Sequence, residues 1–352
     1  MTEPILVVKD LYKYFPVSQS VVDKILRRPQ LEVKALDGIS LSIGKAEIVA
    51  LVGESGSGKT TLSMNILGLQ SPTSGEAFFN ELPLAKWAVG KLDDKDQRRI
   101  GVESKRAQTL EFRRRAQMIF QDPYESLNPR QSIWEIMAEP LEIHSPGLRD
   151  DVKERKVRTA LEDCGLTPAE HFWDRYPDEL SGGQRQRVVI ASALVLEPDL
   201  LLADEPVSML DVSIRADILS LLRTIRDVRG VTILYTTHDL ATAGYFTDRM
   251  IVMYLGRIVE EGPTIEVLKD PKHPYTQALV SVAPAPNPRK RKQRVILKGE
   301  LPNAVHIPNG CRFHPRCPIA QERCKQEDPQ LSPAGTSRKV ACFFAEGINQ
   351  NE

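Results

Sequence analysis

The sequence lacks long apolar runs, an excess of charge of either sign and an abundance of aromatic residues. No stretch of about 20 apolar residues occurs, so no membrane-spanning helix is expected. Residues 1–4 lack the basic-then-apolar pattern of a secretory signal, which predicts a cytosolic chain. The 47 Lys and Arg residues balance the 47 Asp and Glu residues, and aromatic residues make up only 6%. Both facts argue against a nucleic-acid binder, which would show a basic surplus and stacking surfaces.

Cysteine is scarce as well, with five residues in a chain of 352. That length suggests about two domains, which can bury sufficient core without covalent cross-links. Cys164 stands alone and is predicted to be a small buried apolar residue. The other four fall together near the C-terminus, and in a cytosolic chain such a group indicates metal or iron–sulfur ligation before disulfides. They are Cys311, Cys317, Cys324 and Cys342.

Strands and helices are predicted to alternate along most of the chain. Continuous apolar runs at 47–52, 200–203 and 231–235 are typical of strands buried on both faces. A helix is expected over 60–69, and helical patterning dominates 132–196. This alternation predicts an α/β domain with a largely parallel core sheet.

Other segments predict less regular structure. Residues 7–11 and 35–43 indicate strands of a first sheet, with a charged insert at 17–31 between them. The charged segment 86–115 has no apolar face and predicts a surface loop or an exposed helix. From about residue 269 the chain becomes rich in proline, and a separate, loop-rich appendage is expected. The basic run at 289–294 indicates a solvated linker or, alternatively, a patch facing anionic lipid headgroups.

A glycine-rich octet, residues 53–60, lies between a predicted strand and a predicted helix and matches the P-loop pattern. Its glycines allow the tight turn that points successive backbone N–H groups at a phosphate. The Lys59 ammonium is expected to reach the β- and γ-phosphates, and the Thr60 hydroxyl to ligate Mg²⁺. The nucleotide-binding residues predicted here are Gly53, Glu54, Ser55, Gly56, Ser57, Gly58, Lys59, Thr60 and Thr61.

The remaining predicted catalytic groups follow other strands. Asp204 ends a buried strand, where a carboxylate can hold the metal through water, and Glu205 beside it can polarise an attacking water. His238 follows a third core strand, and we expect it to contact the γ-phosphate. Gln121 follows a short apolar run and is expected to sense the metal or the attacking water.

A second anion site is predicted where Ser181 and two glycines open a helix, because bare N–H groups and a hydroxyl then face outward. The chain already has a phosphate site, so this second one suggests a nucleotide held by another chain. Taken together and in this order, the motifs resemble those of the ATP-binding subunit of an ABC transporter over roughly residues 5–265. The residues expected to contact the nucleotide of the opposite subunit are Ser181, Gly182, Gly183, Gln184 and Asp211.

The resemblance implies a P-loop ATPase core with a mostly parallel sheet, an antiparallel β subdomain and an inserted helical subdomain at about 123–197. That nucleotide-binding domain would span 1–266, followed by a C-terminal extension at 267–352. By the same resemblance Glu205 is the catalytic base, Gln121 links to the helical subdomain and Asp211 communicates across a dimer. The family stacks adenine on an aromatic residue upstream of the P-loop, for which Phe15 is the best match and Tyr14 the alternative.

Segments 120–123, 126–130 and 273–276 resemble the oligopeptide/dipeptide import branch of this family. The resemblance implies ATP and Mg²⁺ as cofactors and a location at the cytoplasmic face of the membrane. The implied partners are a second ATPase subunit, identical or paralogous, two membrane permeases and an extracytoplasmic substrate-binding protein, with no nucleic acid. The implied solute is a peptide, with oligosaccharides or nickel complexes as alternatives.

Two other classes of protein fit the sequence less well than a transport ATPase. Soluble ABC ATPases of DNA repair or translation carry coiled-coil inserts or duplicated cassettes, and this sequence shows neither. An iron–sulfur redox sensor with a vestigial ATPase would not need the intact Glu205 and His238.

The C-terminal cysteines resemble those that hold a [4Fe–4S] cluster in the extension of peptide-importer ATPases. Their spacing, C-x5-C-x6-C-x17-C, differs from the paired C-x2-C knuckles of zinc ribbons. Four thiolates can hold either an iron–sulfur cluster or zinc, so zinc and the absence of a metal remain as alternatives. His314 is an alternative ligand or a structural residue.

Overall fold

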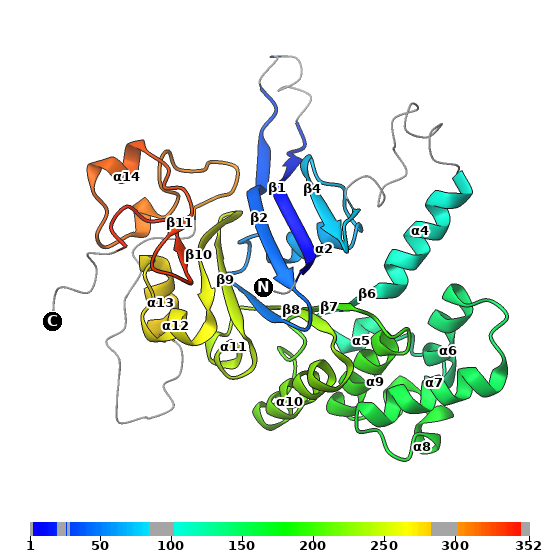
Figure 1. The fold of residues 1–352 in the computed structure, drawn as a ribbon. Coiled ribbons are helices and arrows are strands. Elements are labelled where there is room, and N and C mark those ends of the chain that lie inside the picture. Colours follow the sequence, from blue (N-terminus) through cyan, green and yellow to red (C-terminus); the bar gives the residue numbers. More distant parts are fainter. Residues whose placement is uncertain (1–2, 20–25, 27–28, 85–101, 283–301, 346–352) are drawn as a thin grey trace. The chain divides into compact units, whose positions relative to one another are not determined.

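The computed structural model describes residues 3–19, 26, 29–84, 102–282 and 302–345 (Figure 1). The chain divides into two units, and each is described by itself. The first comprises residues 1–3, 44–48 and 86–236, and the second comprises 4–43, 49–85 and 237–352. The basic run 289–294 and parts of the predicted inserts 17–31 and 86–115 lie outside the described residues.

The second unit contains an antiparallel sheet, and its strands confirm the predicted first sheet. Strand β1 pairs with β4, with Leu6 opposite Phe79, and the strand order is β2-β1-β4-β5. Figure 1 shows β2, β1 and β4 side by side in shades of blue. The bounds are β1 Pro4–Pro16, β2 Glu32–Gly44, β4 Ser74–Phe79 and β5 Leu82–Pro83.

A second group of strands in the same unit carries the phosphate loop. Strand β3 (Ile48–Val52) is buried throughout, as its apolar run predicted, and runs parallel to β9 (Arg249–Tyr254). Strand β9 pairs antiparallel with β10 (Arg257–Pro263). Helix α2 (Lys59–Ile66) follows the loop after β3. The other helices are α11 Leu240–Phe246, α12 Thr264–Lys269 and α13 Pro274–Val282.

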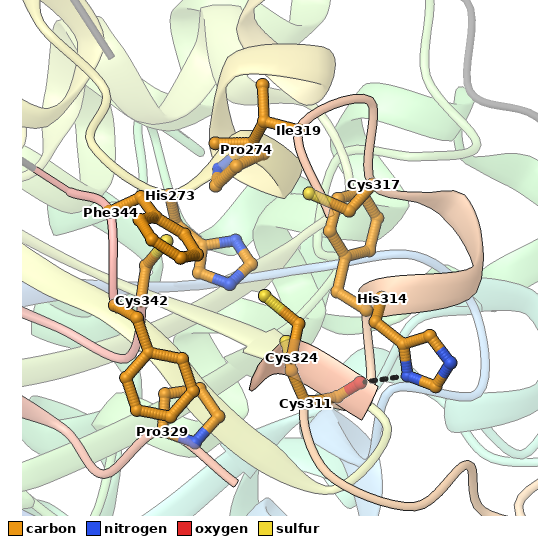
Figure 2. Close-up of a pocket in the computed structure, with 12 residues that line it drawn as sticks. His273, Pro274, Cys311, His314, Cys317, Ile319, Cys324, Pro329, Cys342 and Phe344 are labelled. Carbon is orange, nitrogen blue, oxygen red and sulfur yellow. Dashed lines mark hydrogen bonds between the residues drawn. The ribbon is translucent and has the colours of Figure 1, made fainter. Parts of the chain in front are cut away.

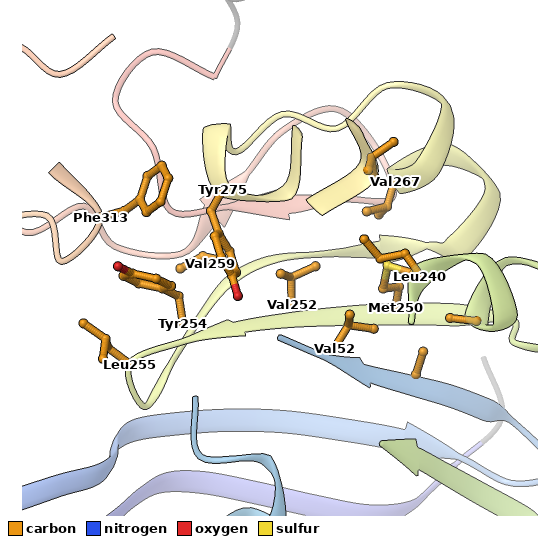
Figure 3. Close-up of a cluster of buried hydrophobic side chains, with 13 residues drawn as sticks. Val52, Leu240, Met250, Val252, Tyr254, Leu255, Val259, Val267, Tyr275 and Phe313 are labelled. Atoms are coloured by element: carbon orange, nitrogen blue, oxygen red, sulfur yellow. The ribbon is translucent and has the colours of Figure 1, made fainter. Parts of the chain in front are cut away.

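The C-terminal extension is not the separate appendage that its composition predicted. Its strand β12 (Lys339–Val340) pairs antiparallel with β10 and with β11 (Ser332–Pro333), and so extends the second unit's sheet. Phe313 and Tyr275 are buried in one core cluster with Val52 and Met250 (Figure 3). The sequence did not predict this core, because the apolar residues of the proline-rich extension follow no regular period. The short helices here are η2 His314–Arg316 and α14 Glu322–Gln326.

The first unit contains three parallel strands, in the order β6-β7-β8, which confirms the predicted parallel sheet. They are β6 Ala116–Ile119, β7 Leu200–Asp204 and β8 Thr232–Thr237. The last two were predicted from continuous apolar runs, and every residue in them is buried. Helix α10 (Val212–Arg229) connects them and ends at Gly230, whose positive φ of 69° terminates the helix.

Helices predominate in the remaining described residues of the first unit, as the pattern over 132–196 predicted. The charged segment before β6 includes helix α4. This helix was expected to be fully exposed to solvent, but its residue Phe112 is buried. Cys164 is completely buried, as predicted, and burial raises the pKa of its thiol to about 12. Across the described ranges, no helix combines the length and apolar character needed to cross a bilayer. The bounds are α4 Val102–Arg115, α5 Pro123–Ser126, α6 Ile133–His144, α7 Asp150–Asp163, α8 Glu170–Trp173, η1 Pro177–Glu179 and α9 Gly182–Leu194.

Candidate nucleotide site and cysteine pocket

The phosphate loop, defined as residues 53–60, turns tightly between β3 and α2. Gly58 has a φ of 105°, and a Cβ there would lie 2.4 Å from the Ala35 carbonyl oxygen. A Cβ on Gly53 would lie 2.3 Å from the Met253 carbonyl oxygen. Only glycine therefore fits at either position, and the backbone at both ends of the loop is fixed by its packing.

Lys59 is buried inside this loop. Its ammonium donates hydrogen bonds to the carbonyl oxygens of Gly53 at 2.8 Å and Glu54 at 3.1 Å. The side chain is only 6% exposed, so the cation stands within the turn of the loop. In contrast, Ser55 and Thr60 are exposed, and the loop therefore presents hydroxyl groups to solvent beside an enclosed cation.

The two aromatic candidates for stacking adenine differ in their surroundings. The Tyr14 hydroxyl is hydrogen-bonded to the Asp37 carboxylate, and burial raises the pKa of Tyr14 well above its usual value. Phe15 is half-buried, with the Lys13 ammonium 4.8 Å from its ring centroid. The Lys34 ammonium likewise lies 5.4 Å from the centroid of the Tyr14 ring, so each of the two rings has a cation over one face. His238, in the same unit as the phosphate loop, is exposed directly before α11.

Asp204, Glu205 and Gln121 come together in the first unit at the end of β7. Gln121 Nε2 donates to Glu205 Oε2 at 3.3 Å. Glu205 has a left-handed φ of 45°, and its N–H donates to the Thr236 carbonyl at 3.1 Å. The Thr236 hydroxyl is hydrogen-bonded to the Asp204 carboxylate. The backbone turn thus separates the two acidic side chains, with Asp204 buried and Glu205 partly exposed.

Residues 181–184 begin helix α9 in the same unit. Ser181 and Gln184 form a capping box: the Ser181 hydroxyl accepts from the Gln184 N–H at 3.3 Å, and the Ser181 N–H donates to Gln184 Oε1 at 3.0 Å. A Cβ on Gly182 would meet nothing nearer than 3.8 Å, whereas one on Gly183 would lie 3.0 Å from Ile214 Cγ2. Asp211 precedes α10, and its side chain makes no capping hydrogen bond.

The four C-terminal cysteines line one pocket, together with His273 and Phe344 (Figure 2). Burial raises the pKa of the Cys311 thiol to about 12 and that of Cys317 to about 11, and the neighbouring cysteines add to each rise. His314 also lines the pocket, and its Nδ1 lies 2.9 Å from the Cys311 carbonyl oxygen. Within the described residues, no group of three or more His, Cys, Asp or Glu side chains is arranged to hold a metal ion.

Three residues contact the predicted site although the sequence did not predict these contacts. Thr236 binds Asp204, while Tyr275 and Arg316 bind Glu54. Thr236 lies two residues before His238 at the end of a predicted strand, and this position could have marked it as a site residue. Arg316 lies 262 residues from Glu54, and no local pattern connects them.

Two family models match the chain. One, described as ABC transporter, matches residues 36–208, and the other, described as oligopeptide/dipeptide transporter, C-terminal region, matches residues 259–324. The second range includes three of the clustered cysteines and ends before Cys342. Neither match supports an iron–sulfur cluster.

Relatives match almost the whole chain. The dipeptide transport ATP-binding protein DppF of Haemophilus influenzae is 39% identical over 97% of this chain and 96% of its own length. The oligopeptide transport ATP-binding protein AppF of Bacillus subtilis is 40% identical over 97% and 98%. The di/tripeptide transport ATP-binding protein DppF of Pseudomonas aeruginosa is 42% identical over 98% of both chains.

Solved structures agree with the fold. The chain resembles the dimeric ATP-binding cassette MJ0796 in a post-hydrolysis state with ADP and Pi, with a TM-score of 0.58 and 27% identity over 74% of this chain and 98% of that one. It also resembles cbiO1 of Clostridium perfringens, with a TM-score of 0.59 and 29% identity over 76% and 92%. The chain therefore belongs to the ATP-binding proteins of ABC transporters, in the branch that carries the oligopeptide/dipeptide transporter C-terminal region.

Proposed function

We propose that this ATPase hydrolyses ATP through the residues that the sequence motifs single out. Lys59 and the N–H groups of the phosphate loop bind the β- and γ-phosphates, and Phe15 stacks on the adenine. Thr60 and Asp204 hold Mg²⁺, which neutralises charge that develops on the phosphates. His238 contacts the γ-phosphate.

Glu205 is proposed to accept the proton of the attacking water. The contact that supports this role is the 3.3 Å hydrogen bond from Gln121 Nε2, because it orients the carboxylate that would accept the proton. The hydrogen bond from the Thr236 hydroxyl orients the Asp204 carboxylate separately from that of Glu205. The two carboxylates can therefore have different roles, Asp204 at Mg²⁺ and Glu205 as the base. Gln121 also precedes the helices at 123–194, and it is proposed to link hydrolysis to their position.

Two such subunits are proposed to enclose ATP, with residues 181–184 and Asp211 of one reaching the γ-phosphate held by the other. The dimeric state of MJ0796 supports this arrangement. The pair would dock at the cytoplasmic face of the membrane under two permeases, which receive solute from an extracytoplasmic binding protein. The second ATPase is either a copy of this chain or a paralogue. In both cases each ATP would lie between the phosphate loop of one subunit and residues 181–184 of the other.

Peptides are the proposed solute, because three relatives that match nearly the full chain are described as dipeptide, di/tripeptide or oligopeptide transport proteins. The test is phosphate release by the complete complex in liposomes, with its binding protein loaded in turn with peptides, oligosaccharides or nickel complexes. We expect peptides alone to stimulate hydrolysis above the basal rate. Stimulation by another class, with none from peptides, would reassign the solute and leave the ATPase role in place.

We further propose that Cys311, Cys317, Cys324 and Cys342 hold a [4Fe–4S] cluster. Their convergence on one pocket from separate segments supports this, since four thiolates are the ligand set that such a cluster requires. The raised pKa values show that burial disfavours free thiolates there, so a cluster would have to displace the thiol protons on binding. The side chains would also have to turn toward a common centre, because no three of them are arranged for a metal.

Iron analysis of anaerobically purified protein tests this second proposal. We expect about four irons and four labile sulfides per chain and a broad absorbance near roughly 400 nm. Cys324→Ser should bleach the protein while ATP binding persists, whereas Cys164→Ser, a buried cysteine outside the pocket, should retain the colour. Stoichiometric zinc without iron would show that the cysteines form a structural zinc site and not a cluster. Finding neither metal would refute the proposal.

A further inference from the structure

Glu54 connects the phosphate loop to the C-terminal extension. Its N–H donates to the Tyr275 hydroxyl at 2.8 Å. Its carboxylate accepts from the Arg316 guanidinium, at 2.9 Å from Nη1 and 3.3 Å from Nη2. Its carbonyl oxygen accepts from Lys59 Nζ at 3.1 Å. A single residue therefore joins two side chains of the extension to the lysine of the phosphate loop.

Arg316 lies in an enclosed place beside the aromatic residues of the core cluster. The side chain is 10% exposed, against 28% for Glu54, so their contact is far more enclosed than an ordinary surface ion pair. The guanidinium lies 6.0 Å from the centroid of the Tyr254 ring. That ring lies 4.7 Å from the Tyr275 ring, and Figure 3 shows both tyrosines. Two parallel N–H···O bonds from a planar guanidinium also fix the direction of the carboxylate.

This contact matters for nucleotide binding because of charge. Glu54 places a carboxylate in the loop that is to receive a triphosphate, and an unpaired carboxylate there would repel it. The Lys59 ammonium already lies against the carbonyl of Glu54, so a released carboxylate would also compete with phosphate for that cation. Arg316 neutralises the carboxylate and keeps it turned toward the extension.

We propose that Arg316, supported by Tyr275, is a positioning residue for ATP: through Glu54 it sets the shape and charge of the phosphate loop, so that the C-terminal extension controls nucleotide affinity. The inference rests on the proposed function, because it takes residues 53–60 to be the ATP-binding loop. It gives the extension a part in nucleotide binding.

Equilibrium binding of a fluorescent ATP analogue to the full chain tests this proposal. We expect Arg316→Ala to raise the Kd about tenfold, since it removes two charge-assisted hydrogen bonds and leaves a carboxylate unpaired. Adding Glu54→Gln to Arg316→Ala should recover most of the affinity, because the repelling charge is gone. The matched control is Lys325→Ala, which removes a cation of the same extension from an exposed pair with Glu322 and should leave the Kd unchanged.

A Kd for Arg316→Ala equal to that of the unmodified protein would overturn the proposal. So would a double variant that binds as weakly as Arg316→Ala, because Arg316 would then serve the fold and not the charge of the loop. If Arg316→Ala does not fold, Tyr275→Phe removes only the oxygen that accepts from Glu54, and an unchanged Kd for that variant contradicts the inference. Failure of the unmodified protein to bind the analogue would instead refute the ATP site itself.

Discussion

Glu205→Gln is expected to reduce ATP hydrolysis by at least about 100-fold in the assembled complex while ATP binding is retained. The amide keeps the length of the side chain and the left-handed backbone at residue 205, but it cannot accept the proton of the attacking water. The contact from Gln121 Nε2, at 3.3 Å, reaches an oxygen that the amide also carries, so the local arrangement should persist. Phosphate release and nucleotide binding are measured on the same preparation.

The matched control for this variant is Glu197→Gln. Glu197 lies in the same unit and has a similarly positive φ, 55° against 45°, but its carboxylate pairs with Lys156. The control should hydrolyse ATP at the rate of the unmodified protein. Glu205→Gln activity within about threefold of that rate would exclude Glu205 as the base.

Gly182→Asp is expected to abolish hydrolysis by the ATPase pair while leaving ATP binding by the separate subunit unchanged. A side chain fits there, since a Cβ would meet nothing nearer than 3.8 Å, and an acidic residue in the first turn favours the helix. The carboxylate would nevertheless stand where the γ-phosphate of the opposite subunit is proposed to bind, and like charges repel. Closed dimers with ATP, detected by size-exclusion chromatography, should therefore be lost.

Gly182→Asn separates the effect of charge from the effect of side-chain size, because asparagine has nearly the shape of aspartate and no charge. We expect it to retain much of the activity that Gly182→Asp loses. Gly183→Asp is a poorer test, since its Cβ would lie 3.0 Å from Ile214 Cγ2 and would disturb packing as well. Normal hydrolysis by Gly182→Asp would show that residues 181–184 do not meet a nucleotide of the opposite subunit.

Most of the fold could be predicted because its signals are local. The strands at 200–204 and 232–237 are buried at every position, which produces the unbroken apolar runs that reveal them. The phosphate loop could be found for the same reason, since all its residues lie within one octet between a strand and a helix.

The role of the C-terminal extension could not be predicted from the sequence. Its core residues Tyr275 and Phe313 are separated by proline-rich chain, so no periodic pattern connects them. The Arg316–Glu54 contact joins residues 262 positions apart, and the neighbouring cysteines indicated a metal site instead. Contacts of this kind depend on the tertiary fold, and they leave no mark in local composition.

The most direct test of the central claim is uptake of a labelled peptide into liposomes that contain the complete complex. ATP is enclosed on the side of the ATPase subunits, and the loaded binding protein is supplied on the other side. We expect ATP-dependent accumulation of the peptide by the unmodified complex. We expect none by an equally well assembled complex with Lys59→Ala, which lacks the cation of the phosphate loop. Undiminished uptake with Lys59→Ala would contradict the claim that this chain powers import by binding and hydrolysing ATP.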